Sequence, residues 1–131
     1  MSLSLIIEAA DYRSINRTQP AASWHNQSML RVMSFNIRCA NCDDGVHSWE
    51  QRKTLVLDRI QAYAPDLLGL QECRGDGQAQ YLIKNLPGYI FFGMPRGGES
   101  KTALEMAPLM VRKECFELLD GGDYWLSEEP D

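Results

Sequence analysis

Two short runs of apolar residues, separated by a helical pattern, organise this chain. Apolar and polar side chains alternate along residues 30–37, and Asp66–Glu72 is an apolar run that ends in a carboxylate. Both are predicted to be strands, and apolar residues on both faces of the first are typical of a central strand. Between them, Trp49–Tyr63 carries apolar residues at helical spacing. A strand, a helix and a strand in this order favour a right-handed crossover between parallel strands.

Local signals mark the ends of the predicted helix. Ser48 followed by Gln51 is a capping-box pattern, in which both side chains bind free amides at the helix start. Pro65 disfavours helical geometry at the residue before it, so the helix is predicted to end at Ala64. The charged residues of the helix are predicted to cover its solvent side: Glu50, Arg52, Lys53, Asp58 and Arg59.

Further elements are predicted downstream. Gln78–Leu86 is predicted to be a short helix, and a polar loop at Pro95–Thr102, which contains Arg96 and Lys101, can face a substrate. Glycines at 121 and 122 are predicted to break the chain before its last strand. The predicted strands are Tyr89–Phe92, Leu109–Val111, Cys115–Leu119 and Tyr124–Leu126.

Residues 1–28 have a different character from the rest. They mix polar and apolar residues without a sustained period, apart from one helical turn near Ile6 to Tyr12. We expect a loosely ordered leader or a misassigned start, with Met29 as a natural first residue. Residues 29–131 are then one domain.

Two polar side chains are predicted to meet at one edge of the sheet. Parallel strands place their carboxyl ends on the same edge, where Asn36 and Glu72 end the two strands. Each is in phase with what we take as the inner positions of its own strand, namely Val32 and Ser34 for Asn36, and Leu68 and Leu70 for Glu72.

This pair is a candidate metal site. Carboxylate and amide oxygens suit Mg²⁺ or Mn²⁺, which take few protein ligands and keep positions open for water and phosphate oxygens. Two plainer interpretations stay open: Glu72 is the first solvated residue of a loop, and Asn36 caps the turn that follows it. Arg96 is a candidate anion contact, although an arginine beside two glycines is more often part of a turn.

The cysteines and histidines offer weaker candidates. Cys39 and Cys42 have the C-x-x-C spacing of half a zinc site or of a redox pair, but no second pair follows. Ordinary free thiols in a loop are our expectation. The two histidines, His25 and His47, lie in loop-like sequence without an evident catalytic partner and are interpreted as surface residues.

Composition narrows the classes of function. The chain has 131 residues with 44% hydrophobic composition, four cysteines and a net charge of −5. The acidic balance makes a small phosphoester a better substrate than DNA, because a broad basic surface is missing. No segment is long and apolar enough to span a bilayer, and no signal-like start is present. We expect a cytoplasmic protein with no membrane contact.

Together these residues resemble the start of the endonuclease/exonuclease/phosphatase family. The resemblance rests on the order and spacing of Met33–Arg38, Trp49–Lys53 and Pro65–Glu72. It extends through three later segments that look like the middle of the bacterial members: Pro108–Lys113, Phe116–Asp120 and Tyr124–Pro130.

The resemblance implies an α/β fold, the N-terminal half of a four-layer α/β/β/α sandwich of the DNase I-like type. It implies Mg²⁺-dependent hydrolysis of phosphoesters, with Glu72 as the metal-binding glutamate and Asn36 near the metal and the scissile phosphate. The family's later motifs, which carry a base histidine, a Gly-Asp-Phe-Asn segment and a terminal Ser-Asp-His, have no match here. We therefore expect an N-terminal portion with little or no activity alone, whose exposed sheet edges pair with a completing chain or with a second copy.

Two other classes of function remain open from the sequence. One is a non-catalytic half-domain that serves as an interaction module. The other is a small thiol-redox protein that uses Cys39 and Cys42.

Overall fold

A computed structural model describes residues 2–9, 29–97 and 103–124 of the chain. Two α-helices, one 3₁₀ turn and eight strands lie in these ranges. In chain order they are β1 (Ser2–Ala9), β2 (Val32–Asn36), the 3₁₀ turn Gly45–His47, α1 (Trp49–Tyr63), β3 (Leu67–Gln71), β4 (Cys73–Arg74), α2 (Gln78–Asn85), β5 (Tyr89–Phe92), β6 (Glu105–Met106), β7 (Leu109–Arg112) and β8 (Phe116–Tyr124).

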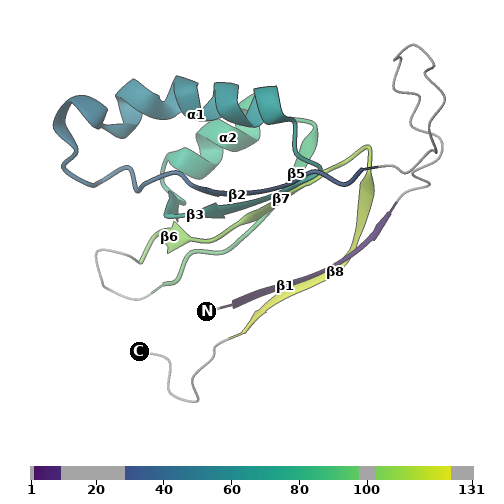
Figure 1. Ribbon diagram of the computed structural model, residues 1–131. Coiled ribbons are helices and arrows are strands. Elements are labelled where there is room, and N and C mark those ends of the chain that lie inside the picture. Colours follow the sequence, from purple (N-terminus) through teal and green to yellow (C-terminus); the bar gives the residue numbers. More distant parts are fainter. Residues whose placement is uncertain (1, 10–28, 98–102, 125–131) are drawn as a thin grey trace, which may run out of the picture.

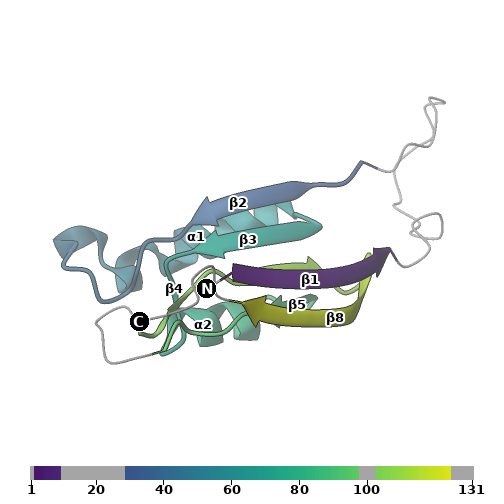
Figure 2. The same cartoon turned by 90° about the horizontal axis from the view of Figure 1, so that it is seen from below.

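A four-stranded mixed sheet forms the centre of the fold, in the order β2-β3-β7-β5. The strands β2 and β3 are parallel, as the strand–helix–strand pattern predicts, and β7 is antiparallel to both of its neighbours. Helices α1 and α2 lie on one face of this sheet, and the paired strands β1 and β8 lie on the other side (Figure 1). Seen from below, β2 and β3 lie beside this two-stranded ribbon, which leaves their face open (Figure 2).

The hydrophobic core lies between the sheet and the two helices. Ile60 of α1, Leu82 of α2 and the β3 residues Leu68 and Leu70 are almost completely buried there, together with Met110 of β7. Removing a side chain of this kind from water contributes about 1.5–3 kcal/mol to folding. The helical face that the sequence pattern identifies therefore holds α1 on the sheet.

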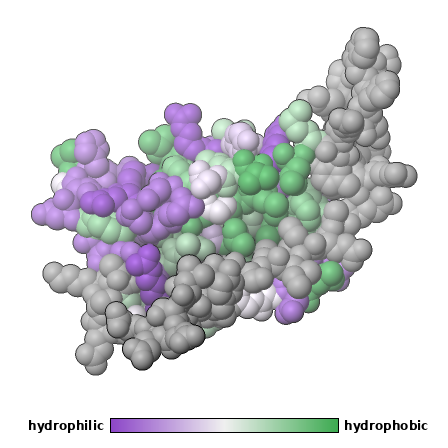
Figure 3. Space-filling view, turned by 60° about the horizontal axis from the view of Figure 1, so that its bottom comes forward, coloured by the Kyte–Doolittle hydropathy of each residue, from purple (hydrophilic) through white to green (hydrophobic). Residues whose placement is uncertain are grey.

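The expectation that the first strand is central is wrong for the described sheet, in which β2 is an edge strand. Met33 and Phe35 pack against the core, whereas Val32 on the opposite face is 58% exposed. Figure 3 shows hydrophobic side chains gathered over the middle of the molecule, with hydrophilic ones toward one end. Apolar residues on both faces of β2 therefore mark an uncovered face as well as the core.

Two further expectations about strands are corrected. Ser2–Ala9, which we expected in a loose leader with a helical turn from Ile6, is a strand paired antiparallel with β8. The glycines 121 and 122 do not break β8, because they pair within it, opposite Leu5 and Ser4. The remaining expectations for residues 10–28, 98–102 and 125–131 lie outside the described residues.

The helix boundaries follow the local signals closely. Ser48 is the N-cap of α1, but its side chain makes no capping hydrogen bond, contrary to the capping-box prediction. Its carbonyl oxygen instead accepts from the amides of Gln51 and Arg52, at 3.0 and 3.2 Å. The predicted helix end is confirmed, since Ala64 caps α1 in a left-handed conformation just before Pro65. Within the described residues, no helix combines the length and apolar character needed to cross a membrane.

A buried carboxylate ties the sheet together at the end opposite the carboxyl ends of β2 and β3. Asp66 is fully buried, and its Oδ2 accepts a hydrogen bond from the amide of Arg31 at 3.0 Å. Its Oδ1 lies 3.3 Å from Nε of Arg112. The main chain of Asp66 bonds to the same two residues, so the starts of β2 and β3 and the end of β7 meet here.

Replacing Asp66 by Ala is expected to lower the free energy of unfolding by about 3 kcal/mol, because it leaves Arg112 without its buried partner. Urea denaturation measures this loss. Asp58→Ala, which removes an exposed carboxylate of α1, is the matched control and is expected to change stability by less than about 0.5 kcal/mol. Equal losses in the two variants would show that the Asp66 network does not hold the sheet.

Candidate active site

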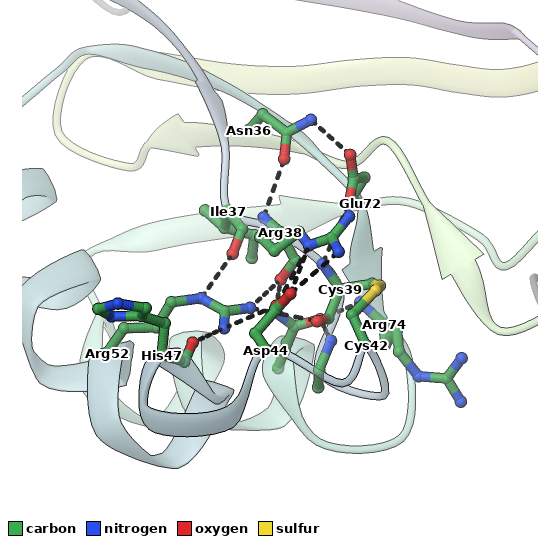
Figure 4. The surroundings of a disulfide bond; sticks show 12 residues. Asn36, Ile37, Arg38, Cys39, Cys42, Asp44, His47, Arg52, Glu72 and Arg74 are labelled. Atoms are coloured by element: carbon green, nitrogen blue, oxygen red, sulfur yellow. Dashed lines mark hydrogen bonds and ion pairs between the residues drawn. A yellow bond between two sulfur atoms is a disulfide. The ribbon is translucent and has the colours of Figure 1, made fainter.

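Asn36 and Glu72 meet at the carboxyl end of the parallel pair, as the sequence predicts. The register places Asn36 opposite Gln71, so Glu72 is the first residue beyond the paired segment. Nδ2 of Asn36 donates a hydrogen bond of 2.8 Å to Oε1 of Glu72 (Figure 4). Two residues that are 36 positions apart in the sequence therefore form one polar cluster.

The route by which Glu72 reaches Asn36 differs from the phase argument. Asn36 shares the open face with Val32, while Leu68 and Leu70 point into the core, so alternation alone would send Glu72 to the opposite face from Asn36. Glu72 has a φ of 56°, in the left-handed region. Glutamate is uncommon in this left-handed region. The change of backbone direction brings the carboxylate of Glu72 back to Asn36.

The amide of Asn36 serves two neighbours at once. While Nδ2 donates to Glu72, Oδ1 accepts a hydrogen bond of 2.8 Å from the amide of Arg38, two residues ahead. This second contact is the turn cap that the sequence left open as an alternative. Because a backbone amide can only donate, it fixes the orientation: the nitrogen of the Asn36 side chain, not the oxygen, faces Glu72.

Glu72 is held as a carboxylate by several donors. Its Oε2 accepts from the amide of Cys39 at 3.2 Å and lies 3.8 Å from Nη1 of Arg38. The hydrogen bonds from Asn36 and then from Cys39 lower the pKa of Glu72 below its ordinary value. The side chain is 35% exposed, so it is open to a ligand but is not a freely solvated loop carboxylate.

Arg38 connects this carboxylate to a second one. Its guanidinium donates to Asp44 through Nε and Nη2, at 3.2 and 3.0 Å. The contact raises the pKa of Arg38 and lowers the pKa of Asp44, although both groups are solvent-screened. Asp44 therefore competes with Glu72 for the positive charge of Arg38.

Arg52, which we expected on the solvent side of the helix, is directed into the loop that follows β2. We call residues 37–47 the site loop. Nη1 of Arg52 donates to the carbonyl oxygen of His47 at 2.6 Å, and Nη2 donates to that of Arg38 at 2.6 Å. Further bonds reach the carbonyl oxygens of Ile37 and Cys39. One planar guanidinium thus satisfies four carbonyl acceptors of an irregular segment.

Gln78 holds the same loop from the other side, and sequence reasoning missed its role. This fully buried residue of α2 accepts from the amides of Ala40 and Arg74 through Oε1, at 3.2 and 3.0 Å. Its Nε2 donates to the carbonyl oxygen of Arg38 at 2.8 Å. A polar residue at the start of an amphipathic helix gives no signal of such contacts, because they depend on the tertiary fold.

The expectation of free thiols is wrong for Cys39 and Cys42, which form a disulfide within the site loop (Figure 4). Their Cα atoms are 5.8 Å apart, a usual separation for a disulfide. Cys73 and Cys115 are buried thiols outside this disulfide. The C-x-x-C pair, for which free thiols were the expectation and a redox pair was an alternative, therefore closes the loop beside Glu72.

Other candidates do not join this cluster. His47 is exposed, as expected, and Figure 4 places it away from Glu72. The described residues contain no group of three or more His, Cys, Asp or Glu side chains that could hold a metal ion. Arg96 is exposed, and its amide donates to the carbonyl oxygen of Glu105 at 2.9 Å.

The chain belongs to the endonuclease/exonuclease/phosphatase family, since residues 33–113 match the model of that family. The match contains both Asn36 and Glu72. The mixed sheet with helices on one face is part of the DNase I-like fold of its solved relatives.

Three relatives illustrate the likeness. A family member from Bacteroides vulgatus is 40% identical to this chain, with a TM-score of 0.68. The matched part is 78% of this chain and 38% of the Bacteroides vulgatus chain. The Bacteroides thetaiotaomicron mannosyl-6-phosphatase is 34% identical, with a TM-score of 0.67. The matched part is 79% of this chain and 39% of the phosphatase. Mouse Nocturnin is 39% identical over 57 residues, which are 36% of this chain and 13% of Nocturnin. The chain thus spans less than half the length of the relatives it matches.

Replacing Asn36 by Ala is expected to raise the pKa of Glu72, because it removes the hydrogen bond that lowers this pKa most. As the pH falls, the Glu72 carboxylate of the variant takes up its proton first. The same carboxylate in the unaltered protein stays charged to a lower pH. An NMR titration of the Glu72 side chain measures the shift. Ser34→Ala is the matched control, since this hydroxyl on the same strand face accepts from Gln71 instead. An unchanged Glu72 pKa in the Asn36 variant would contradict the assignment.

Proposed function

We propose that the Asn36–Glu72 edge is the first part of the active site of a metal-dependent phosphoester hydrolase. The carrying observation is the convergence of these two side chains at the shared end of β2 and β3, where the hydrogen bond between them is 2.8 Å long. In this proposal Glu72 binds Mg²⁺ or Mn²⁺. Asn36 positions the carboxylate, since its amide nitrogen faces Glu72 while its oxygen is taken by Arg38.

The donor set fits such an ion. Mg²⁺ is commonly held by one or two carboxylates and keeps several water molecules and phosphate oxygens as its other ligands. Glu72 supplies one ionised, partly exposed carboxylate, and further ligands come from water, substrate or chain beyond the described residues. When bound, the ion supplies positive charge that stabilises the charge developing on a phosphoryl oxygen.

The residues around Glu72 have separate tasks in this proposal. Asn36 and the amide of Cys39 fix the orientation of the carboxylate and keep it deprotonated. Arg38 adds positive charge at the rim, where its side chain is 54% exposed and accessible to an anionic substrate. Asp44 restrains Arg38, so this positive charge stays beside Glu72 rather than closing onto it.

A small phosphoester is the substrate class we favour. One relative is a mannosyl-6-phosphatase, and the net charge of −5 disfavours a long polyanion such as DNA. The chain spans less than two fifths of the solved relatives, and His47 lies away from Glu72. We therefore propose that a general base comes from chain beyond the described residues, and that these 131 residues alone have little activity.

The alternative is a non-catalytic half-domain that binds a completing chain. It is favoured by the open edge of β2, where Met29, Leu30 and Val32 are exposed. A groove of about 580 Å³ lies along this edge and α1, lined by Val32, Met33, Ser34, Arg59, Ala62 and Tyr63. A strand edge with which no described strand pairs, beside an apolar groove, is suited to β-strand addition by a second copy or a partner.

Metal binding distinguishes the two functions. Isothermal titration calorimetry with Mn²⁺ is expected to show binding to the unaltered protein, weakened at least about tenfold in Glu72→Gln because the anionic ligand is lost. Glu50→Gln is the matched control, since this exposed carboxylate of α1 pairs with Lys53 rather than with Asn36 or Arg38. If the unaltered protein binds no Mn²⁺, the hydrolase proposal fails and the interaction module is favoured.

Catalysis by the chain alone is tested separately. The purified 131-residue protein with Mg²⁺ or Mn²⁺ is expected not to turn over a generic phosphodiester such as bis-p-nitrophenyl phosphate, because His47, a candidate base, lies away from Glu72. Release of nitrophenol measures turnover. Robust turnover that disappears in Glu72→Ala would show that the chain carries a complete site.

A further inference from the structure

One residue of the site loop is both half of the disulfide and a direct partner of Glu72. The side chain of Cys39 is bonded to Cys42, and its backbone amide donates to Oε2 of Glu72 at 3.2 Å. The conformation of the loop at this point therefore decides whether the carboxylate keeps one of its two hydrogen-bond donors.

The disulfide joins two halves of the site loop that are held differently. The first half is fixed to the helices, because Arg52 donates to the carbonyl oxygen of Cys39 and Gln78 accepts from the amide of Ala40. The second half, 41–43, is exposed or half-buried at the surface. The bond from Cys42 to Cys39 covalently ties this second half to the first.

The second half leads directly to the carboxylate that restrains Arg38. Asp44 follows two residues after Cys42, and its amide donates to the carbonyl oxygen of Cys42 at 3.0 Å. Its side chain holds the guanidinium of Arg38, whose Nη1 lies 3.8 Å from Glu72. If Asp44 moves away, Arg38 is left with Glu72 as its neighbouring anion and competes there with a metal ion.

We propose that the Cys39–Cys42 disulfide is a redox-sensitive support for Glu72, so that its reduction by a dithiol weakens divalent-metal binding at this carboxylate. Reduction acts through both routes in the same direction. It removes one of the restraints on the Cys39 amide that orients Glu72, in addition to the contacts from Arg52 and Gln78. It also removes one restraint on the segment of Asp44, which lies 3.6 Å from Nη1 of Arg52 and draws Arg38 away from Glu72. This inference rests on the proposed role of Glu72 as a metal ligand.

The chemistry is an ordinary thiol–disulfide exchange. A thiolate of the dithiol attacks Sγ of Cys42, which is half-buried, whereas Cys39 is only 4% exposed. The bond between the two cysteine sulfurs breaks, and Sγ of Cys39 leaves with the electron pair and takes up a proton. The second thiol of the reductant then displaces Cys42. Two cysteine thiols form while the dithiol is oxidised to its own disulfide.

The other two cysteines do not interfere with this exchange. Cys73 and Cys115 are 0% and 1% exposed, and burial raises the pKa of the Cys73 thiol to about 12. The thiolate is the reactive form, so Cys73 stays a protonated, enclosed thiol at neutral pH. A change in the redox state of the protein is therefore confined to the pair in the site loop.

The test compares Mn²⁺ affinity in the oxidised and reduced protein. Intact mass after alkylation under denaturing conditions counts the thiols in each sample, and calorimetry after anaerobic removal of dithiothreitol gives the affinity. Reduction is expected to weaken Mn²⁺ binding about tenfold, as loss of a charge-assisted hydrogen bond does. The variant Cys42→Ser is expected to bind as weakly as the reduced protein, with or without the reductant.

Several results would overturn the support role. One is the same Mn²⁺ affinity before and after Cys39 and Cys42 are shown to be reduced. Another is a Cys42→Ser protein that binds Mn²⁺ as tightly as the oxidised form.

Failure of the proposed function is recognised separately, by an absence of Mn²⁺ binding in both redox states. Amide hydrogen exchange over residues 36–44 then tests, independently of metal binding, whether the disulfide holds the site loop. Faster exchange after reduction supports its role in holding the Cys39 amide, and unchanged exchange overturns it.

Discussion

The parallel pairing of β2 with β3 is the constraint from which the geometry of the site follows. Its register sets Asn36 opposite Gln71, so both strands end at the same level and their next residues enter loops side by side. Parallel strands need a long crossover, and α1 supplies it while burying its apolar face on the sheet. Packing of α1 and the position of the polar cluster are therefore consequences of one arrangement.

The parts of this arrangement that sequence could predict are those decided locally or by a repeating pattern. Pro65 ends α1, apolar spacing identifies its buried face, and the strand–helix–strand order gives the shared edge. The turn of Glu72 into the left-handed region could not be predicted, because glycine, asparagine and aspartate are the residues that usually adopt it. Strict alternation consequently placed the Glu72 side chain in the wrong phase, although its meeting with Asn36 was correctly expected.

The support of the site loop was beyond sequence reasoning for a different reason. An irregular loop has carbonyl oxygens without ladder partners, and they must be satisfied by whatever donors the fold brings near. Arg52 and Gln78 do this here, yet each occupies a helix position where polarity ordinarily means solvent. The pairing of Cys39 with Cys42 is similar, since spacing alone does not distinguish a disulfide from two free thiols or half a metal site.

The hydrogen-bond donors around Glu72 leave room for a cation, and Arg38 competes with that cation for the carboxylate. A carboxylate has about four lone-pair directions, and the bonds from Asn36 and Cys39 take one on each oxygen. An ion can therefore bind without displacing them. Arg38 is a described neighbour of Glu72 whose charge opposes a metal ion, and Asp44 binds the guanidinium of Arg38 with the opposite charge. The balance between these two residues, set by a loop that the disulfide closes, decides how much negative potential Glu72 presents.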